Sequence, residues 1–539
     1  MKKITVLILT MLSVFTLTAC KEEEPIETLD FNELYPNHRN YYQVFVRSFA
    51  DSDNDGIGDF NGIKENLDYF VDLGVEGLWL MPIHPSPSYH GYDIDDYYAV
   101  NSDFGTLEDF EALTAAAEEK GIDIIIDYVL NHSSDTHPWF EAFKRGEEPY
   151  DEYYRRIETD DERYGSRGSW GQTIWHSLGD GTYYAGYFGG HMPDLNWSNE
   201  AVQQEMLDVA LYWMDLGVSG FRLDAAMHLQ ARNEVPSGYI AFQETLFQLE
   251  YWEFQLKEAY PEAYVVGEIW EDFDLYKEFF AVMDSAFHFD FGHLVVNTIN
   301  RGHNDEYAEQ LIDWHEASLA ISPDAIEAPF LRNHDQNRIA SNGSDGAPNI
   351  GDDLAGLKLA AEMLLTVPGN PYIYYGEELG MKGEAYNQAP IWDATIRLPM
   401  LFETDYKTTW TSDLWGYEDT YNQDVASVET QQEDETSLYN VYRKLLHLRQ
   451  DSLALKYGTM LEYEQNHAGL QGFYRLFDYD EDHQDVVLVL HNVSEETFDA
   501  PETFEEILYY SGGAYEGELA PQSTLIVQMN NDLLGEGDE

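Results

Sequence analysis

Asp123-Ile124-Ile125-Ile126-Asp127-Tyr128-Val129-Leu130-Asn131-His132 is the stretch that says most about the fold of this 539-residue chain. Three consecutive isoleucines favour a β-strand, and a nearly continuous apolar run is typical of a strand buried on both faces of a parallel sheet. Polar side chains follow directly, at Asn131 and His132. The stretch therefore predicts a parallel sheet with polar groups at the carboxyl end of this strand.

Similar apolar runs occur on both sides of this strand and alternate with helix-like stretches. They predict strands at 42–46, 77–81, 219–224, 264–268, 328–331 and 372–375, and helices that include 107–120 and 200–216. Alternation of β and α segments indicates a parallel sheet, either open or closed. The intervals between strand ends favour closure, because a (β/α)8 TIM barrel uses about 31 residues per βα unit. The predicted fold class is therefore α/β.

Two regions do not fit the repeating barrel unit. The interval between Asp127 and Asp224 is about three times one unit, so we predict a domain inserted after the third strand, at 133–197. After about residue 455 the pattern changes to short alternating runs, such as 485–490 and 523–527, which predict a C-terminal antiparallel β-sandwich. The predicted domains are a barrel at 38–132 and 198–453, the insertion, and a β-sandwich at 454–539.

The amino-terminal residues have the character of an export signal. Lys2 and Lys3 precede an apolar run that ends at Leu17-Thr18-Ala19-Cys20, so residues 1–20 read as a secretory signal peptide. The closing tetrapeptide resembles a bacterial lipobox, which implies lipidation of Cys20 and an extracellular protein tethered to the cell membrane. Residues 21–37 would form an acidic tether. An ordinary signal peptide with an incidental cysteine stays open.

Composition excludes several classes of function. Hydrophobic residues make up 44% and aromatic residues 14%, as expected for a globular chain with a large core. Lys plus Arg number 29 against 101 Asp plus Glu, a net charge of −72. Nucleic acid is therefore an unsuitable partner, and so is a membrane surface except through the lipid anchor. We expect a monomer. Self-repulsion at this charge also predicts a halophilic protein, although a merely acidic secreted enzyme stays open.

Polar residues end four of the predicted strands. In a barrel the carboxyl ends of the strands converge on one mouth, where catalytic groups lie. Alternation of side chains along a strand places Arg222 and Asp224 on the same face. We therefore predict one site that contains His132, Arg222, Asp224, Glu268, His334 and Asp335.

At these positions the sequence resembles the α-amylase family of glycoside hydrolases, often called family 13. DYVLNH (127–132), GFRLDAAMH (220–228), GEIW (267–270) and FLRNHD (330–335) resemble the four family signatures in order. HMPDLNW (191–197) resembles a further signature near the end of the inserted domain. The resemblance covers about residues 40–535. It implies the barrel, the inserted domain B and the C-terminal β-sandwich that the spacing predicts independently.

The resemblance also implies a retaining mechanism, which needs two carboxyl groups on either side of the scissile bond. Asp224 would be the nucleophile, Glu268 the general acid/base and Asp335 a third acid that binds sugar hydroxyls. Arg222 would hold Asp224 ionised, because an adjacent cation favours the charged form. The remaining substrate-binding residues implied by the family are Tyr92, Asp93, His132, His334 and Arg397.

An acidic loop predicts a calcium site. Carboxylates at alternate positions around Gly56 suit a hard cation with oxygen ligands. The loop resembles the calcium loop that follows the first barrel strand in many family members, which implies the ligands Asp51, Asp53, Asp55, Asp59 and the Ile57 carbonyl. The alternative interpretation is an acidic turn that binds no cation. Asn131 and His228 match two ligands of a second family calcium site, but its ligand from domain B is not identified.

The substrate class follows from the family with alternatives. Ala225-Ala226 resembles amylases, which favours hydrolysis of α-1,4 bonds in starch and maltooligosaccharides. Met192-Pro193-Asp194-Leu195-Asn196 is intermediate between α-1,6-glucosidases and neopullulanases, and Asp93 with Arg397 matches exo-acting glucosidases. An exo-acting α-glucosidase, an oligo-1,6-glucosidase, a neopullulanase and a lipid-tethered glucan-binding protein therefore stay open.

Overall fold

The structure is a computed structural model of the whole chain. It describes residues 31–229, 238–343, 349–386, 392–403, 405–415, 419–478, 484–501 and 503–530. The chain divides into two units, residues 1–36 and 37–539. The described part of the first unit holds the short helix α1 (Phe31–Leu34). The predicted signal peptide, Cys20 and residues 21–30 of the predicted tether lie outside the described residues.

An eight-stranded parallel sheet forms the centre of the second unit. Its strands lie in the order β10-β9-β8-β7-β3-β2-β1-β11, and a parallel bridge between Phe330 and Tyr372 joins the two ends. This arrangement confirms the predicted barrel. The strands are β1 (Tyr41–Val44), β2 (Gly77–Leu80), β3 (Asp123–Val129), β7 (Gly220–Asp224), β8 (Tyr264–Gly267), β9 (Ser285–His288), β10 (Ile326–Pro329) and β11 (Tyr372–Tyr374).

Several strand bounds differ from the sequence prediction; β10, for example, begins two residues before the predicted strand at 328–331 and ends two residues before its end. The predicted strand at 42–46 ends at Val44, because the backbone N–H of Ser48 bonds the Phe45 carbonyl and begins the helical turn α2 (Val46–Phe49). The strand β9 had no individual prediction, and the interval between Glu268 and Asp335 indicated only that about two units lie there. Its four residues, Ser-Ala-Phe-His, form no apolar run.

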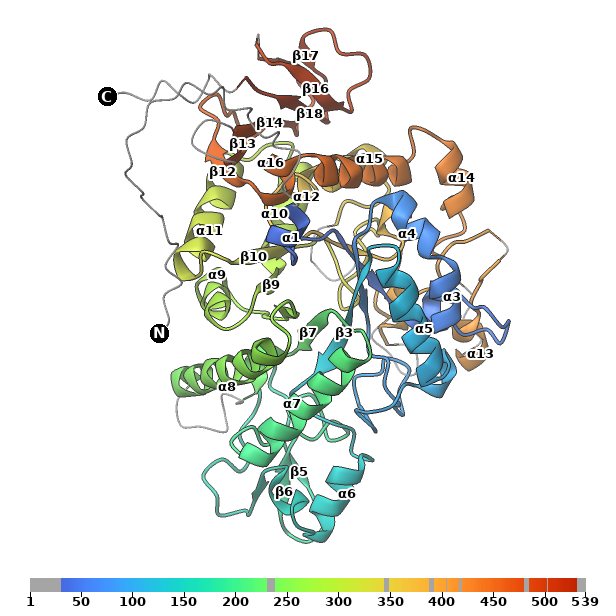
Figure 1. Cartoon of the computed structure of the whole chain (residues 1–539), viewed down its shortest axis with the longest axis vertical. Helices are drawn as coiled ribbons and strands as arrows, with labels where there is room; N and C mark the ends of the chain where they lie inside the picture. Colours follow the sequence, from blue (N-terminus) through green and yellow to red (C-terminus); the bar gives the residue numbers. More distant parts are fainter. Residues whose placement is uncertain are drawn as a thin grey trace, which may run out of the picture. The chain divides into compact units, whose positions relative to one another are not determined.

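Helices surround the barrel, and aromatic side chains fill it. Figure 1 shows α3, α4 and α5 along one side of the central strands and α7 and α8 along another. Inside, Tyr41 stacks on Tyr264 and Tyr372 at ring-centre distances of 5.2 and 4.8 Å, so the barrel is a packed core. The larger helices are α3 (Phe60–Glu65), α4 (Leu67–Leu73), α5 (Leu107–Glu118), α7 (Glu200–Asp215), α8 (Gly238–Ala259), α10 (Phe289–Arg301), α11 (Tyr307–Ile321), α12 (Leu354–Leu364) and α15 (Leu438–Asp451).

A small sheet interrupts the barrel between β3 and β7, where the insertion is predicted. It comprises β4 (Arg156–Ile157), β6 (Tyr183–Ala185) and β5 (Trp175–Ser177), preceded by α6 (Pro138–Arg145). Two isolated β-bridges, His132 with Asp194 and Tyr154 with Leu195, join the last residues of the insertion to its first part. These bridges place the end of the insertion next to the carboxyl end of β3.

The carboxyl-terminal residues form an antiparallel sheet. Its five strands are β12 (Thr459–Glu462), β13 (Leu470–Asp478), β14 (Gln484–Asn492), β18 (Ser523–Gln528) and β16 (Glu506–Tyr510), with β15 (Phe498–Asp499) and β17 (Glu518–Leu519) as a separate pair. The predicted border at residue 454 falls inside the short helix α16 (Leu453–Tyr457), which also contacts α15 and β13. Among the described helices, none is both long enough and apolar enough to cross a membrane.

Candidate active site

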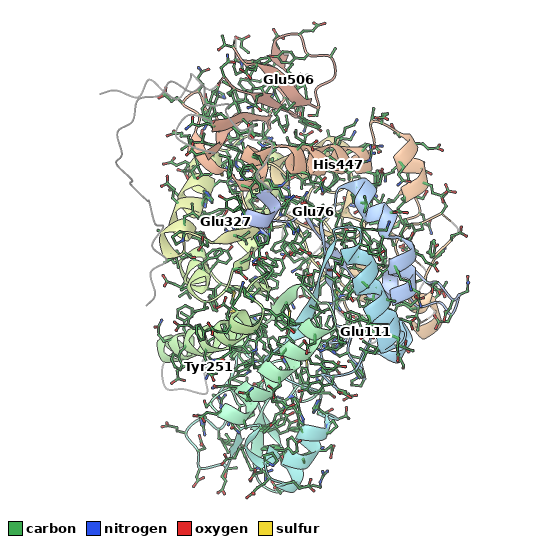
Figure 2. All side chains as sticks on the ribbon, viewed as in Figure 1. Glu76, Glu111, Tyr251, Glu327, His447 and Glu506 are labelled. Carbon is green, nitrogen blue, oxygen red and sulfur yellow. The ribbon has the colours of Figure 1, made fainter. Side chains whose placement is uncertain are left out.

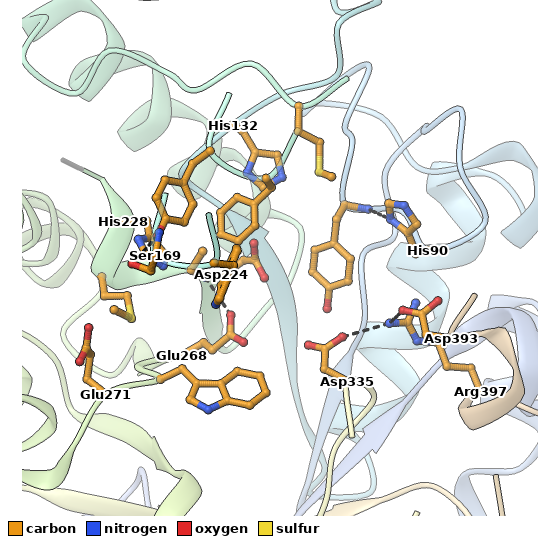
Figure 3. A pocket seen from close by; sticks show the side chains of 18 residues that line it. His90, His132, Ser169, Asp224, His228, Glu268, Glu271, Asp335, Asp393 and Arg397 are labelled. Carbon is orange, nitrogen blue, oxygen red and sulfur yellow. Dashed lines mark hydrogen bonds and ion pairs between the residues drawn. The ribbon is translucent and has the colours of Figure 1, made fainter. Parts of the chain in front are cut away.

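Two adjacent barrel strands carry the first two predicted acids. Asp224 is the last residue of β7, and Glu268 directly follows β8. The backbone N–H of Glu268 bonds the Leu223 carbonyl at 3.0 Å, which continues the ladder between these strands. Figure 3 shows the side chains of Asp224 and Glu268 together on one side of the cavity, and Asp335 on the other.

A single buried guanidinium binds the carboxylates. Arg222 lies 2.8 Å from Asp127, 2.6 Å from Asp224 and 3.0 Å from Glu268, and its side chain is fully enclosed. The indole ring of Trp79 packs against it at 4.9 Å. Two different nitrogens contact Asp224 and Glu268, so these carboxylates lie side by side.

Burial and crowding favour a retained proton in this cluster. Burial raises the pKa of Asp224, Arg222 opposes the rise, and the neighbouring Glu268 and Asp127 charges add to it. Burial likewise raises the pKa of Asp127 to about 6. Asp127 and Asp224 thus each hold a proton more tightly than an exposed carboxyl group does, although they share the Arg222 cation.

The third acid belongs to a second ion-pair group. Arg397 binds Asp335 at 3.0 Å and Asp393 at 2.8 Å, and His334 Nε2 lies 3.1 Å from Asp335. Burial raises the pKa of Asp335 to about 7, against the lowering effect of Arg397. The Tyr89 hydroxyl donates to Asp393. This group fixes Asp335 opposite the first pair.

Aromatic and imidazole side chains lie between the two groups. The ring of Tyr92 stacks on that of His334, and its hydroxyl contacts Asp127 at 3.0 Å. The other His334 nitrogen, Nδ1, contacts the Gln43 amide at 2.7 Å. Burial lowers the pKa of His132 to about 3, so this imidazole is neutral. Tyr92 and His132 therefore offer polar and stacking contacts without adding charge.

These groups line a cavity of 610 Å³, which is large enough for several sugar units. Asp224, Glu268, Asp335, Tyr92, His132 and Arg397 line it, and Arg222 and His334 contact lining residues directly. Trp170 and Trp270, which also line the cavity, are 67% and 53% exposed. The cavity therefore combines acids for chemistry with exposed aromatic rings that suit sugar stacking.

Like Arg222 and His334, Asp93 does not line the cavity itself, and its carboxylate lies 3.9 Å from Nδ1 of the cavity-lining His90. The Asp93 carboxylate accepts hydrogen bonds from Ser86 at 2.6 Å and from Ser88, and Asp93 is 3% exposed. Besides Asp335, Arg397 pairs with Asp393, which sequence reasoning missed. The spacing of four residues between Asp393 and Arg397 was the available signal.

Asp127 was also missed as a site residue. It is fully buried within β3, in register with Arg222 on β7. An acid inside an otherwise apolar strand was the signal, because a buried carboxylate requires a cation or hydrogen-bond donors nearby. Its partners are Arg222, the Trp79 indole and the Tyr92 hydroxyl.

The acidic loop brings three of its four predicted carboxylates together. Oxygens of Asp51, Asp53 and Asp59 lie within 4.8 Å of one another. Asp55 is not in this group, and its carboxylate accepts from the Ile57 N–H at 2.8 Å. Asp59 also caps α3 by accepting from the Gly62 N–H at 2.7 Å. The group is made of hard oxygen donors, the kind that suits calcium.

The two residues that match a second calcium site bind each other. The side-chain amide of Asn131 donates to the His228 carbonyl at 2.8 Å. This hydrogen bond places the Asn131 side chain beside the His228 carbonyl and links the end of β3 to the turn after β7.

Comparisons with known proteins agree with this architecture. The family model described as "Alpha amylase, catalytic domain" matches residues 43–458. Alpha-amylase 3 of Dictyoglomus thermophilum is 35% identical over 93% of this chain and 95% of its own length, and the 4-alpha-glucanotransferase of Thermotoga maritima is 35% identical over 64% and 72%. A solved alpha-amylase from H.orenii is 34% identical, with a TM-score of 0.80 over 92% of this chain and 100% of its own. The chain therefore belongs to the alpha-amylase family of enzymes that hydrolyse glycosidic bonds.

Proposed function

We propose that this protein is an α-amylase that hydrolyses α-1,4-glucosidic bonds in starch and maltooligosaccharides with retention of configuration. The observation that carries the proposal is the pair of carboxylates, Asp224 and Glu268, held by one guanidinium in a cavity of sugar-binding size. The similarity to Alpha-amylase 3 of Dictyoglomus thermophilum, which extends over 95% of that protein, supports the choice of substrate.

In the first step Asp224 attacks the anomeric carbon while Glu268 protonates the departing glycosidic oxygen. The leaving glucan takes that proton, and a covalent glycosyl ester with Asp224 remains. Arg222 stabilises the carboxylate form of Asp224 before attack through its 2.6 Å contact. Asp335, held by Arg397 and His334, accepts hydrogen bonds from hydroxyls of the reacting sugar.

In the second step Glu268 acts as a base. It takes a proton from water, the water oxygen attacks the anomeric carbon, and the ester bond to Asp224 breaks. The backbone N–H of Ala225 donates to Glu268 at 3.0 Å and thereby stabilises the ionised form that exists between the two steps. The product leaves, and both carboxyl groups return to their starting protonation states.

The test removes each acid without changing its size. Glu268→Gln should lower kcat on maltoheptaose by about 10²–10⁴-fold, the usual contribution of a general acid/base, and Asp224→Asn should lower it at least as much. Asp208→Asn on the surface of α7 is the matched control and should be unaffected. NMR of the first product should show the α anomer. Wild-type turnover in either variant, or initial release of the β anomer, contradicts the mechanism.

A transferase activity has separate support. The two relatives called 4-alpha-glucanotransferase share 35% and 34% identity with this chain over 64% of its length. A covalent glycosyl intermediate reacts with a sugar hydroxyl as readily in principle as with water, so the same residues would serve both reactions. Products longer than maltoheptaose in an assay on maltoheptaose alone would identify transfer. The exo-acting alternative keeps support from Arg397, which lines the cavity, and from Asp93, which lies 3.9 Å from the cavity-lining His90.

We further propose that the acidic loop binds structural calcium through Asp51, Asp53 and Asp59, with Asp55 and the Ile57 carbonyl as the remaining ligands predicted from sequence. The donor set fits, because Ca²⁺ takes six to eight oxygen ligands from flexible loops. A bound cation would offset the mutual repulsion of the carboxylates and hold the loop. The loop in turn contacts the 405–409 segment through two backbone hydrogen bonds. The Thr409 N–H donates to the Gly56 carbonyl, and the Asp51 N–H donates to the Tyr406 carbonyl.

Titration calorimetry and thermal melts test the calcium proposal. Added Ca²⁺ should bind with measurable heat and raise Tm, and EGTA should reverse both effects. Asp53→Asn should weaken binding, whereas Asp68→Asn on α4, outside the loop, should not. A chain that shows no heat and no change in Tm does not use this loop for calcium.

We also propose that Cys20 carries a lipid that anchors an extracellular monomer to the cell membrane. The lipobox-like residues 17–20 support the anchor, and the charge of −72, which opposes self-association, supports the monomer. Cys20→Ser should release the enzyme into the culture medium, and light scattering should give the mass of one chain.

A further inference from the structure

The outer face of α8 carries three exposed aromatic side chains. Phe247, Tyr251 and Phe254 are 69%, 46% and 55% exposed, and their spacing of four and three residues places them on one stripe of the helix. Tyr251 is labelled on this helix in Figure 2. The opposite face is buried through Leu249, Trp252 and Leu256, among others. A surface helix normally turns polar residues to solvent, so the stripe departs from that pattern.

The stripe has the size and chemistry of a binding surface. Seven residues of helix span about 10 Å. A contiguous exposed apolar patch usually marks a place where something binds. Aromatic rings bring large flat apolar faces, and the Tyr251 hydroxyl adds a polar group at the edge. A flat partner with both apolar and hydroxyl surfaces fits such a strip.

The surrounding charge selects among partners. Glu250 and Glu258 are exposed on the same helix, and the side chain of Lys257 is bound to Asp284 at 2.8 Å. An anionic lipid surface would be repelled by these acids, and a second copy would bring the same acids and a further net charge of −72. A neutral polymer meets no such repulsion.

We propose that Phe247, Tyr251 and Phe254 form a surface site that holds an α-glucan chain outside the catalytic cavity. The identity of the polymer rests on the proposed function. None of the three side chains lines the 610 Å³ cavity, so the site is separate from the residues that cleave the bond. A glucan bound at both places is held by two contacts, which raises its effective concentration at the active site.

The experiment separates surface binding from hydrolysis. Phe247→Ala/Tyr251→Ala/Phe254→Ala, in the Asp224→Asn background that does not digest its ligand, should bind amylopectin in affinity gels about tenfold more weakly than Asp224→Asn alone. The matched control changes polar residues of the same face, Gln243→Ala/Glu250→Gln/Glu258→Gln, and should keep full binding. In the otherwise wild-type enzyme, the aromatic triple variant should keep its kcat/KM on maltotriose and lose activity on granular starch.

Three results would overturn the proposal. The first is undiminished amylopectin binding by a folded triple variant, with folding checked by its thermal melt. The second is a change from dimer to monomer in light scattering, which would assign the stripe to contact between copies. The third is an equal loss on maltotriose and granular starch. Failure of the proposed function looks different, because the wild-type protein would then not cleave maltoheptaose at all, whatever the stripe binds.

Discussion

At the scale of single residues, Arg222 and Ala225 organise the candidate active site. Arg222 contacts three carboxylates, one within β3, one at the end of β7 and one directly after β8. Removing such a buried charge would leave uncompensated negative charges at a cost of about 3–5 kcal/mol. Ala225 has the left-handed conformation, with φ of 46°, which is rare for a residue with a side chain. Ala225 directly follows Asp224, and this backbone conformation directs the Ala225 N–H toward the Glu268 carboxylate. Backbone strain and buried charge therefore occur together where chemistry is proposed.

Tyr89 offers a prediction at the same scale. Its hydroxyl donates to Asp393, its ring stacks on Trp410 at 5.4 Å, and the Arg397 guanidinium lies 5.8 Å from its centre. Tyr89→Phe removes the hydrogen bond and keeps the ring, so Asp393 and Arg397 lose part of their support in the cavity. We expect kcat/KM on maltoheptaose to fall about tenfold, mainly through a higher KM.

Tyr98→Phe is the matched control for that variant. It deletes a hydroxyl that bonds Glu205 at 3.0 Å, away from the cavity. Steady-state kinetics of the two variants side by side give the comparison. Equal kinetics for both would mean that Tyr89 has no role in positioning Asp393 and Arg397.

At the scale of elements, α12 meets the C-terminal sheet through a buried carboxyl group. Glu362 is 1% exposed and accepts a hydrogen bond from Tyr509 of β16 at 2.9 Å. Burial raises the pKa of Glu362 to about 7. Between the pKa values of the unfolded and folded states, Glu362 therefore keeps its proton in the folded protein and has released it in the unfolded chain. The stability linked to this proton is fully present below the unfolded pKa of about 4.3 and is lost as pH rises through about 7.

Glu362→Gln should remove this pH dependence, because glutamine has the same shape and no titrating group. Between about pH 5 and pH 9 the free energy of unfolding of the wild type should fall by about 3 kcal/mol more than that of the variant. Urea unfolding at several pH values measures the difference. The exposed Glu118→Gln on α5 serves as control and should follow the wild type. Parallel curves for wild type and Glu362→Gln would refute this role of the α12 junction.

At the scale of the whole molecule, acidic charge dominates. With 101 acidic and 29 basic residues, like charges repel one another across the surface and oppose the compact state. Salt shortens the range of this repulsion to about 3 Å at 1 M ionic strength. The halophilic character predicted from composition follows from this balance and is open to a direct test.

Thermal melts across NaCl concentration provide that test. We expect Tm to rise by several degrees as NaCl increases from tens of millimolar to molar concentrations, with most of the rise at the low end where screening changes fastest. Sucrose is the control, since it favours compact states by exclusion without screening charge. A Tm that does not change with NaCl, or that rises equally with sucrose, would contradict the halophilic prediction.

The sequence by itself determined the barrel, the place of the insertion and the three strand-end acids that the family resemblance names as catalytic. Apolar runs of strand length are local features, and in a closed parallel sheet all strand ends meet at one mouth, so Asp224, Glu268 and Asp335 could be assigned to one site from their order alone. The roles of these acids stay predictions until their variants are measured. β9 escaped individual prediction because Ser-Ala-Phe-His has no apolar period to detect.

Only the tertiary structure decided which side chains pair and which face is exposed. It gave Arg397 the partner Asp393, turned Asp93 toward Ser86 and Ser88, and grouped Asp127 with Arg222. It also left one aromatic stripe of α8 in solvent, although that helix is rich in apolar residues around its circumference. Such outcomes depend on contacts between residues far apart in the chain, and the periodicity of a single segment carries no information about what packs against it.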